Sequence, residues 1–137
     1  MIVVDTSAII AILNDEPERA GFIKALSGED EVRMAAPILV EATAASLRWG
    51  DKMARDDLPR VLSAFSILIS DMTAEQAEIA RQAYLRFGKG RGGPAQLNIC
   101  DCFSYALAKS LHAPLLFKGD DFGHTDVISA LQRESPS

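Results

Sequence analysis

The sequence has few of the residues on which several common kinds of site depend. It contains two cysteines and two histidines, which do not form a Cys/His zinc pattern. Cys100 and Cys102 lie two positions apart, and on a helix such residues point in different directions, so we expect free thiols in a reducing compartment. Neither His112 nor His124 has a recognisable serine or cysteine partner, so a catalytic triad is unsupported.

Long apolar runs and an excess of positive charge are also missing. No apolar run approaches the roughly 18 residues of a membrane span, and no basic stretch precedes the first apolar run, so we expect a cytoplasmic protein without a signal peptide. The net charge of −5 argues against a general nucleic-acid coat. Residues 79–100, however, contain no acid and four basic residues. One surface can therefore be basic while the whole molecule is acidic.

The 137 residues, 48% of them hydrophobic, predict a single domain, 1–137, whose tail frays after about residue 132. Short apolar runs at 2–4, 32–35 and 115–117 predict buried strands, and a further strand is possible at 66–69. Helices are expected at 7–13, from Pro17 to about 28, and at 37–49, 53–65, 74–87 and 97–111. This alternation predicts an α/β fold with a parallel sheet and helices on both faces.

Acidic residues occur where the predicted strands end or the following helices begin. Asp5 follows the first strand, Glu41 lies one turn into the helix after the second, and Asp101 lies in the first turn of helix 97–111. Asp120 and Asp121 directly follow strand 115–117. Because these ends meet at one edge of a parallel sheet, we expect the acids to converge there.

Most of these acids also have a purely structural explanation. Asp5 or Thr6 can cap the first helix, Asp101 can support an N-cap at Asn98, and the Asp120 pair suits a turn. Glu41 is harder to explain by a structural role, because burying a glutamate without a partner costs roughly several kcal/mol of folding free energy. Clustered carboxylates raise one another's pKa unless a cation neutralises them. Oxygen ligands without a zinc pattern indicate Mg²⁺ or Mn²⁺.

Such a site is suited to metal-assisted hydrolysis with one ion or two. The hydroxyls of Thr6 and Ser7 could add contacts to the metal or to a phosphate. Lys118, Lys89 and Arg91 are candidates for holding a substrate backbone. Lys89 and Arg91 fall in the segment 88–94, which has four glycines and is either a plain linker or a mobile basic loop near phosphates.

Several motifs together resemble a PIN domain of the VapC toxin type. They are DTSA at 5–8, Glu41, NICDCFSYALA at 98–108, and LLFKGDDF at 115–122 followed by Thr125 and Asp126. The resemblance spans essentially the whole chain. It implies a three-layer α/β/α sandwich, a Mg²⁺- or Mn²⁺-dependent endoribonuclease acting on RNA, a VapB-type antitoxin that blocks the acidic pocket, and a homodimer.

Matching positions assign roles to individual residues. The resemblance implies that Asp5, Glu41 and Asp101 are catalytic acids that bind metal. The fourth acid is Asp120 or Asp121, of which Asp120 is preferred because it comes first after the strand. Asn98 and Thr6 match supporting polar positions, and Ser7, next to Thr6, is a further supporting polar residue.

Three other functions use similar residues. A structure-specific DNA nuclease or a metal phosphatase could use the same acidic pocket. A non-catalytic receiver-like module would need a phosphate-accepting aspartate at the end of a central strand. The acids in that part of the chain are Asp51, Asp56 and Asp57, and they fall on a predicted helix. The receiver-like reading is therefore the weaker one.

Overall fold

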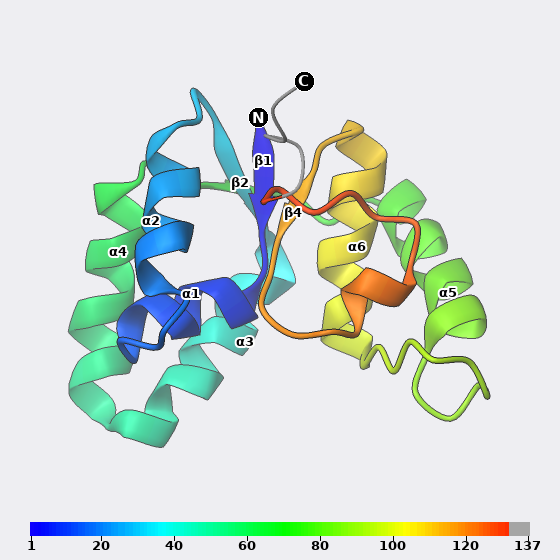
Figure 1. Ribbon diagram of the computed structural model, residues 1–137, viewed down its shortest axis with the longest axis horizontal. Helices are drawn as coiled ribbons and strands as arrows, with labels where there is room; N and C mark the ends of the chain where they lie inside the picture. Colours follow the sequence, from blue (N-terminus) through cyan, green and yellow to red (C-terminus); the bar gives the residue numbers. More distant parts are fainter. Residues whose placement is uncertain (132–137) are drawn as a thin grey trace.

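A four-stranded parallel sheet lies at the centre of the protein, whose computed structural model describes residues 1–131 (Figure 1). The strands are β1 (Ile2–Val4), β2 (Val32–Ala35), β3 (Leu68–Ser70) and β4 (Leu115–Leu116). Their order is β3-β2-β1-β4, and every neighbouring pair is parallel. The predicted parallel sheet is therefore confirmed, with β1 as an inner strand.

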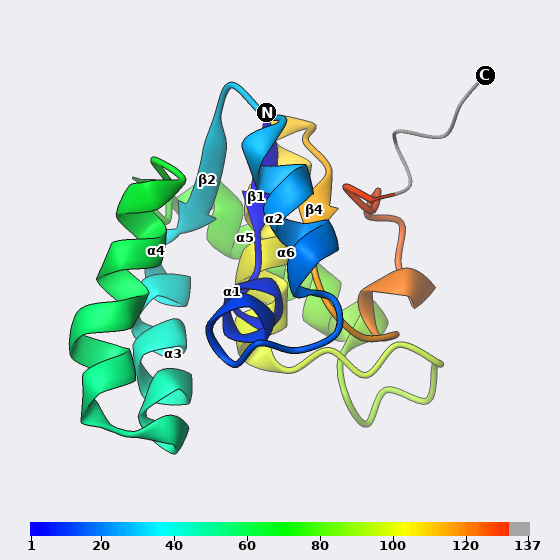
Figure 2. The same ribbon diagram turned by 60° about the vertical axis from the view of Figure 1, so that its left-hand side comes forward.

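Helices cover the sheet on both sides and complete three layers. Figure 1 shows α1, α2 and α4 on one side of the strands and α5 and α6 on the other, and the turned view in Figure 2 shows α3 beside α4. The helices are α1 (Thr6–Leu13), α2 (Arg19–Ser27), α3 (Ala36–Ser46), α4 (Leu58–Ala64), α5 (Ala74–Phe87) and α6 (Ile99–Leu111). Short helical turns occupy η1 (Leu47–Trp49), η2 (Met53–Asp57) and η3 (Phe122–His124).

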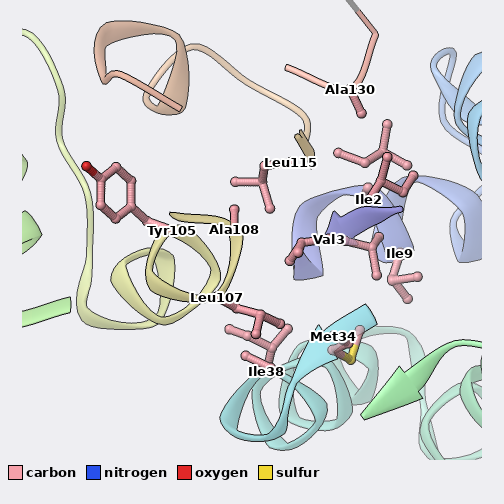
Figure 3. Packing of buried hydrophobic residues seen from close by; sticks show 14 of the residues in the cluster. Ile2, Val3, Ile9, Met34, Ile38, Tyr105, Leu107, Ala108, Leu115 and Ala130 are labelled. Carbon is pink, nitrogen blue, oxygen red and sulfur yellow. The ribbon is translucent and has the colours of Figure 1, made fainter. Parts of the chain in front are cut away.

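The core is built around β1. Ile2, Val3 and Val4 are at most 1% exposed, as expected for a strand that is covered on both faces. Figure 3 shows part of this core, in which β1 side chains gather with Ile9 of α1 and Leu107 of α6. Close packing of this kind holds the end of β1, and hence the residue that follows it, in a fixed place.

Capping explains where the helices nearest this edge begin. Asp5 is the N-cap of α1, and its carboxylate accepts a hydrogen bond from the backbone N–H of Ser7. Asn98 and Asp101 form a capping box at the start of α6, so this helix begins at Ile99 and not at residue 97. The cap predicted for Asn98 is confirmed.

Other boundaries differ slightly from the predicted ones. Ser66 has a φ of 50° and turns the chain, so the strand predicted at 66–69 lies at Leu68–Ser70. The helix predicted at 53–65 begins as the π-helical turn η2 and continues as α4, with Pro59 in its first turn, where proline is tolerated. The predicted strand 115–117 ends at Leu116. The tail after about residue 132 lies outside the described residues.

The structure also shows the state of the cysteines and the lengths of the helices. Cys100 and Cys102 are both free thiols. Within residues 1–131, each helix is too short or too polar to cross a membrane.

Candidate active site

Acidic side chains from β1, α3, α6 and the segment after β4 lie at the carboxyl edge of the sheet. Asp5 is buried with 2% of its surface exposed, Glu41 and Asp101 are half-buried, and Asp120 and Asp121 are exposed. The charges of Asp5, Glu41 and Asp121 all act on Asp101. These four carboxylates therefore share one electrostatic environment.

Neutral donors hold the carboxylate of Asp5. Ser104 of α6 donates to Asp5 Oδ1 at 2.6 Å, while the backbone N–H and hydroxyl of Ser7 donate to Oδ2 at 3.1 and 2.7 Å. Ser7 Oγ in turn accepts the backbone N–H of Lys118 at 3.0 Å. Asp5 is thus both a helix cap and a member of the acidic group, so the two roles considered for it coexist.

Glu41 has a partner on α1. Thr6 Oγ1 donates to Glu41 Oε1 at 2.5 Å, which connects α3 to the first turn of α1. Burial, followed by the charge of Glu41 and a hydrogen bond to it, raises the pKa of the Cys100 thiol to about 11. The thiol is therefore protonated at neutral pH and lies against this carboxylate as a weak donor.

The pKa of Asp101 is raised by burial and by neighbouring carboxylates. Burial raises it most, the backbone hydrogen bond of Asn98 opposes this effect, and the charges of the neighbouring carboxylates raise it further, to about 7. Asn98 N donates to Asp101 Oδ2 at 2.9 Å, and Asn98 Oδ1 accepts the N–H of Asp101 at 2.8 Å. A group of acids in which one carboxyl is half-protonated near neutrality favours a bound cation.

The candidate substrate-binding cations differ in their surroundings. Lys118 Nζ contacts Glu16 at 2.5 Å and Glu18 at 3.4 Å, so its charge is directed to the loop between α1 and α2. Lys89 and Arg91 are exposed in the glycine-rich segment after α5. Figure 1 shows that segment at the same end of the molecule as the start of α1.

A hollow of about 880 Å³ opens beside the acids. Its walls include Ser7, Glu41, Asn98 and Lys118, together with Arg48 and Trp49. A second hollow of about 610 Å³ is lined by Asp120, and Lys118 and Gly119 line both. The two adjacent aspartates are therefore placed differently: Asp120 faces the second hollow, whereas Asp121 acts on Asp101.

The oxygen atoms of these acids are the right kind of ligand for a hard divalent cation, but their present positions do not form a complete metal site. Carboxylate oxygens are the ligands that Mg²⁺ and Mn²⁺ prefer, and burial, together with the neighbouring negative charges, raises the pKa of Asp101. Over residues 1–131, no three His, Cys, Asp or Glu side chains lie close enough together to hold a metal ion as they stand. Holding a cation would therefore require some of these carboxylates to rearrange.

Sequence reasoning missed three residues at this edge: Ser104, Cys100 and Glu16. Ser104 follows Asp101 by three positions and so shares its face of α6, which is a signal that the sequence carries. Cys100 touches Glu41 through the packing of α6 near α3, and Glu16 pairs with Lys118 across 102 positions. No local pattern indicates those two contacts.

Comparison with known proteins identifies the family of this chain. The sequence profile described as "PIN domain" matches residues 2–128. The chain belongs to the PIN domain family. The Ribonuclease VapC28 of Mycobacterium tuberculosis, a curated relative, is 44% identical to this PIN domain over 131 residues, which are 96% of this chain and 98% of the relative.

Solved structures show the same fold. The VapC20 toxin of Mycobacterium tuberculosis, described as cleaving the sarcin–ricin loop, superposes on this PIN domain with a TM-score of 0.75 at 17% identity, covering 93% of this chain and 97% of VapC20. VapBC2 of Rickettsia felis, solved bound to a promoter DNA fragment, gives a TM-score of 0.73 at 16% identity, covering 94% of this chain and 97% of the other. The α/β/α sandwich is that of PIN domains, which leaves the receiver-like alternative without support.

Proposed function

We propose that this PIN domain is a VapC-type endoribonuclease, the toxin of a type II toxin–antitoxin pair, which hydrolyses phosphodiester bonds of RNA. Relatives named as VapC ribonucleases match almost the full chain at 42 to 44% identity. The observation that carries the proposal is the convergence of Asp5, Glu41 and Asp121 on Asp101, whose pKa they help to raise to about 7. Such a group of acids suits metal-assisted hydrolysis, including that of phosphodiesters.

The proposed cofactor is Mg²⁺ or Mn²⁺. Asp5, Asp101 and one of the adjacent aspartates would hold it, and once bound it would lower the pKa of a water molecule and stabilise charge on the phosphate. The sequence alone favours Asp120 as the fourth ligand. Because the charge of Asp121 acts on Asp101, we favour Asp121 instead. Glu41, held by Thr6, is proposed as the remaining catalytic acid.

The remaining polar residues orient these acids or attract the substrate. Ser7 and Ser104 fix the plane of the Asp5 carboxylate, and Asn98 fixes the first turn of α6. Lys89 and Arg91 are exposed in a glycine-rich segment, where they can approach RNA phosphates. Lys118 lies between the two hollows and is the third proposed phosphate contact.

A VapB-type antitoxin and a second copy of this chain are the proposed protein partners, in the cytoplasm. Two of the structural neighbours are a toxin–antitoxin complex from Klebsiella pneumoniae and VapBC2 of Rickettsia felis. Several large apolar side chains are exposed and could be covered in such complexes. They include Val40, Leu47, Leu68, Ile69 and Ile99.

The proposal is tested by incubating the purified protein with RNA in the presence of Mg²⁺ or Mn²⁺. The wild-type chain should cut RNA, and Asp101→Asn should abolish cutting while retaining the wild-type circular dichroism spectrum. Asp30→Asn, which changes an exposed acid before the amino end of β2, the end of the strand opposite the site, is the matched control and should cut normally. Normal cutting by Asp101→Asn would refute the proposal, and cutting of DNA but not RNA would replace it with the DNA-nuclease alternative.

A further inference from the structure

Trp49 lines the hollow beside the acidic pocket and is partly exposed to solvent. It is the single tryptophan of the sequence, it ends the turn η1 directly after α3, and 38% of its surface is exposed. It lines the same hollow as Glu41, which lies eight positions earlier, roughly 12 Å away along the helix axis at about 1.5 Å per residue. One short nucleic-acid segment can therefore contact both residues.

Arg48 lies over the ring of Trp49. Its guanidinium carbon is 5.6 Å from the ring centroid, within the range of a cation–π contact. Within residues 1–131 no carboxylate pairs with Arg48, in contrast to Lys118, which has two. This cation therefore has no carboxylate partner among the described residues and is available to a phosphate while it lies over the aromatic ring.

The walls of the hollow suit a nucleobase better than a peptide helix. A base has flat apolar faces and polar edges, and the hollow offers an aromatic ring and Ile10 together with the polar side chains of Asn98 and Glu16. An amphipathic helix needs a continuous apolar groove, which these polar residues interrupt. The exposed apolar side chains of Val40 and Leu47 are not part of its walls.

We propose that Trp49 and Arg48 form a subsite on which a base of single-stranded RNA stacks while the neighbouring phosphate reaches the acidic pocket. Stacking on an aromatic ring accepts any base, because every base has a π face. The proposal rests on the proposed ribonuclease function and adds to it a substrate-binding role for two residues outside the acidic group.

The single tryptophan makes the subsite directly observable. In Asp101→Asn, which should bind RNA without cutting it, titration with an oligoadenylate of about eight nucleotides should quench tryptophan fluorescence to saturation. An abasic ribose-phosphate chain of equal length carries the same charge without bases and should leave the fluorescence nearly unchanged. Equal quenching by both chains would show electrostatic attraction alone and would overturn the stacking proposal.

Substitutions give a second, independent measurement. By anisotropy of labelled oligoadenylate, Trp49→Ala in the Asp101→Asn background should weaken binding about tenfold, or ~1.4 kcal/mol, and Trp49→Phe should restore most of it. Arg48→Ala should weaken binding and lower its salt dependence, whereas Arg60→Ala, which removes an exposed arginine on α4, should not. Thermal melting checks that each variant is folded.

The outcomes separate this proposal from the function on which it rests. If the wild-type chain cuts RNA but Trp49→Ala binds and cuts it equally well, the subsite is wrong and the ribonuclease function stands. If Trp49→Ala only abolishes complex formation with the protein encoded by a neighbouring reading frame, the face binds protein and the RNA subsite is again wrong. If the wild-type chain neither binds nor cuts RNA, the proposed function itself fails.

Discussion

Ser104 Oγ donates a hydrogen bond of 2.6 Å to Asp5 Oδ1 although the two residues are 99 positions apart. Ser104 is fully buried, so the bond joins the middle of α6 to the end of β1 within the core. Together with the two hydrogen bonds from Ser7 to Oδ2, it orients the Asp5 carboxylate with neutral donors alone. A carboxylate accepts about four hydrogen bonds, so Oδ1 keeps an acceptor position free for a cation.

Loss of this bond should weaken both the fold and cation binding. Ser104→Ala should lower the free energy of unfolding by about 1.5–3 kcal/mol, because a buried carboxylate loses a donor. It should also weaken binding of Mn²⁺, measured by isothermal titration calorimetry, because the carboxylate is no longer held in one plane. Ser104→Thr, which keeps the hydroxyl, should bind Mn²⁺ more tightly than Ser104→Ala. Equal Mn²⁺ affinity in all three proteins would limit Ser104 to a structural role.

The adjacent aspartates should respond differently to substitution. Asp121→Asn should reduce RNA cleavage by at least tenfold, about 1.4 kcal/mol of barrier, and should lower the pKa of Asp101, because one of the charges that raise it is removed. Asp120→Asn, the matched control, should have a smaller effect, since Asp120 lines the second hollow. Single-turnover rates and carboxyl NMR titrations measure the two effects. The reverse order of rates would return the fourth position to Asp120.

Binding of the cation should release a proton near neutral pH. Because the pKa of Asp101 is about 7, protons compete with the metal below that pH, and affinity for Mn²⁺ should rise from pH 6 to pH 8. Calorimetry in two buffers with different ionisation enthalpies measures the released proton, and Asp101→Asn should release less.

The same raised pKa has a consequence for the metal-free protein. The folded chain holds a proton on Asp101 that the unfolded chain, with an ordinary pKa of 3.8, has already lost. Stability contributed by this residue should therefore decrease as pH rises from about 4 to about 7 and then level off. The difference in melting temperature between the wild-type chain and Asp101→Asn isolates this contribution. A difference that is constant across this range would contradict the assignment.

Asp126 should affect stability and leave the chemistry unchanged. It accepts hydrogen bonds from Tyr105 at 2.5 Å and Lys109 at 3.2 Å, which fasten the segment after η3 to α6. Burial raises the pKa of Asp126, but the bonds from Tyr105 and Lys109 lower it more, so it lies below its ordinary value of 3.8. Asp126→Asn should therefore destabilise the fold at pH 7 by about 1 kcal/mol with an unchanged cleavage rate for each folded molecule.

The sign of the pH effect at Asp126 is opposite to that at Asp101. A carboxyl whose pKa is lowered on folding adds stability above its unfolded pKa and loses it as pH falls through the folded value. The difference in unfolding free energy between the wild-type chain and Asp126→Asn should therefore shrink below pH 3.8. Urea titrations at several pH values measure it, and a difference that grows with acidity would contradict this account.

The sequence predicts the features that depend on local pattern. Three short apolar runs predict β1 and the two strands that pair with it, β2 and β4. The cap at Asn98 follows from its spacing to Asp101. Topology then predicts that acids at strand ends meet, because parallel strands share an edge. These inferences need only the order of elements, which the chain itself supplies.

The contacts that the sequence cannot predict depend on how a helix is rotated about its axis and on which partner a long side chain contacts. The spacing of Ser104 from Asp101 places it on the same face of α6, but its contact with Asp5 also depends on how α6 turns about its axis against β1, which follows from packing across the whole core. Lys118 has a long side chain that can reach an acid on either side, and it selects Glu16 and Glu18. Likewise, Asp120 and Asp121 are equivalent in sequence and are separated only by the turn that begins η3.

The pairing of β1 with β4 sets an order of events during synthesis. Val3 pairs with Leu115, so the strand made first waits for a partner that is made more than a hundred positions later. Asp5 emerges early, but Lys118, whose backbone fixes Ser7, and the aspartates after β4 follow only with that late partner. A partly synthesised chain therefore lacks the complete group of acids, which comes together only after the segment that follows β4 has been made.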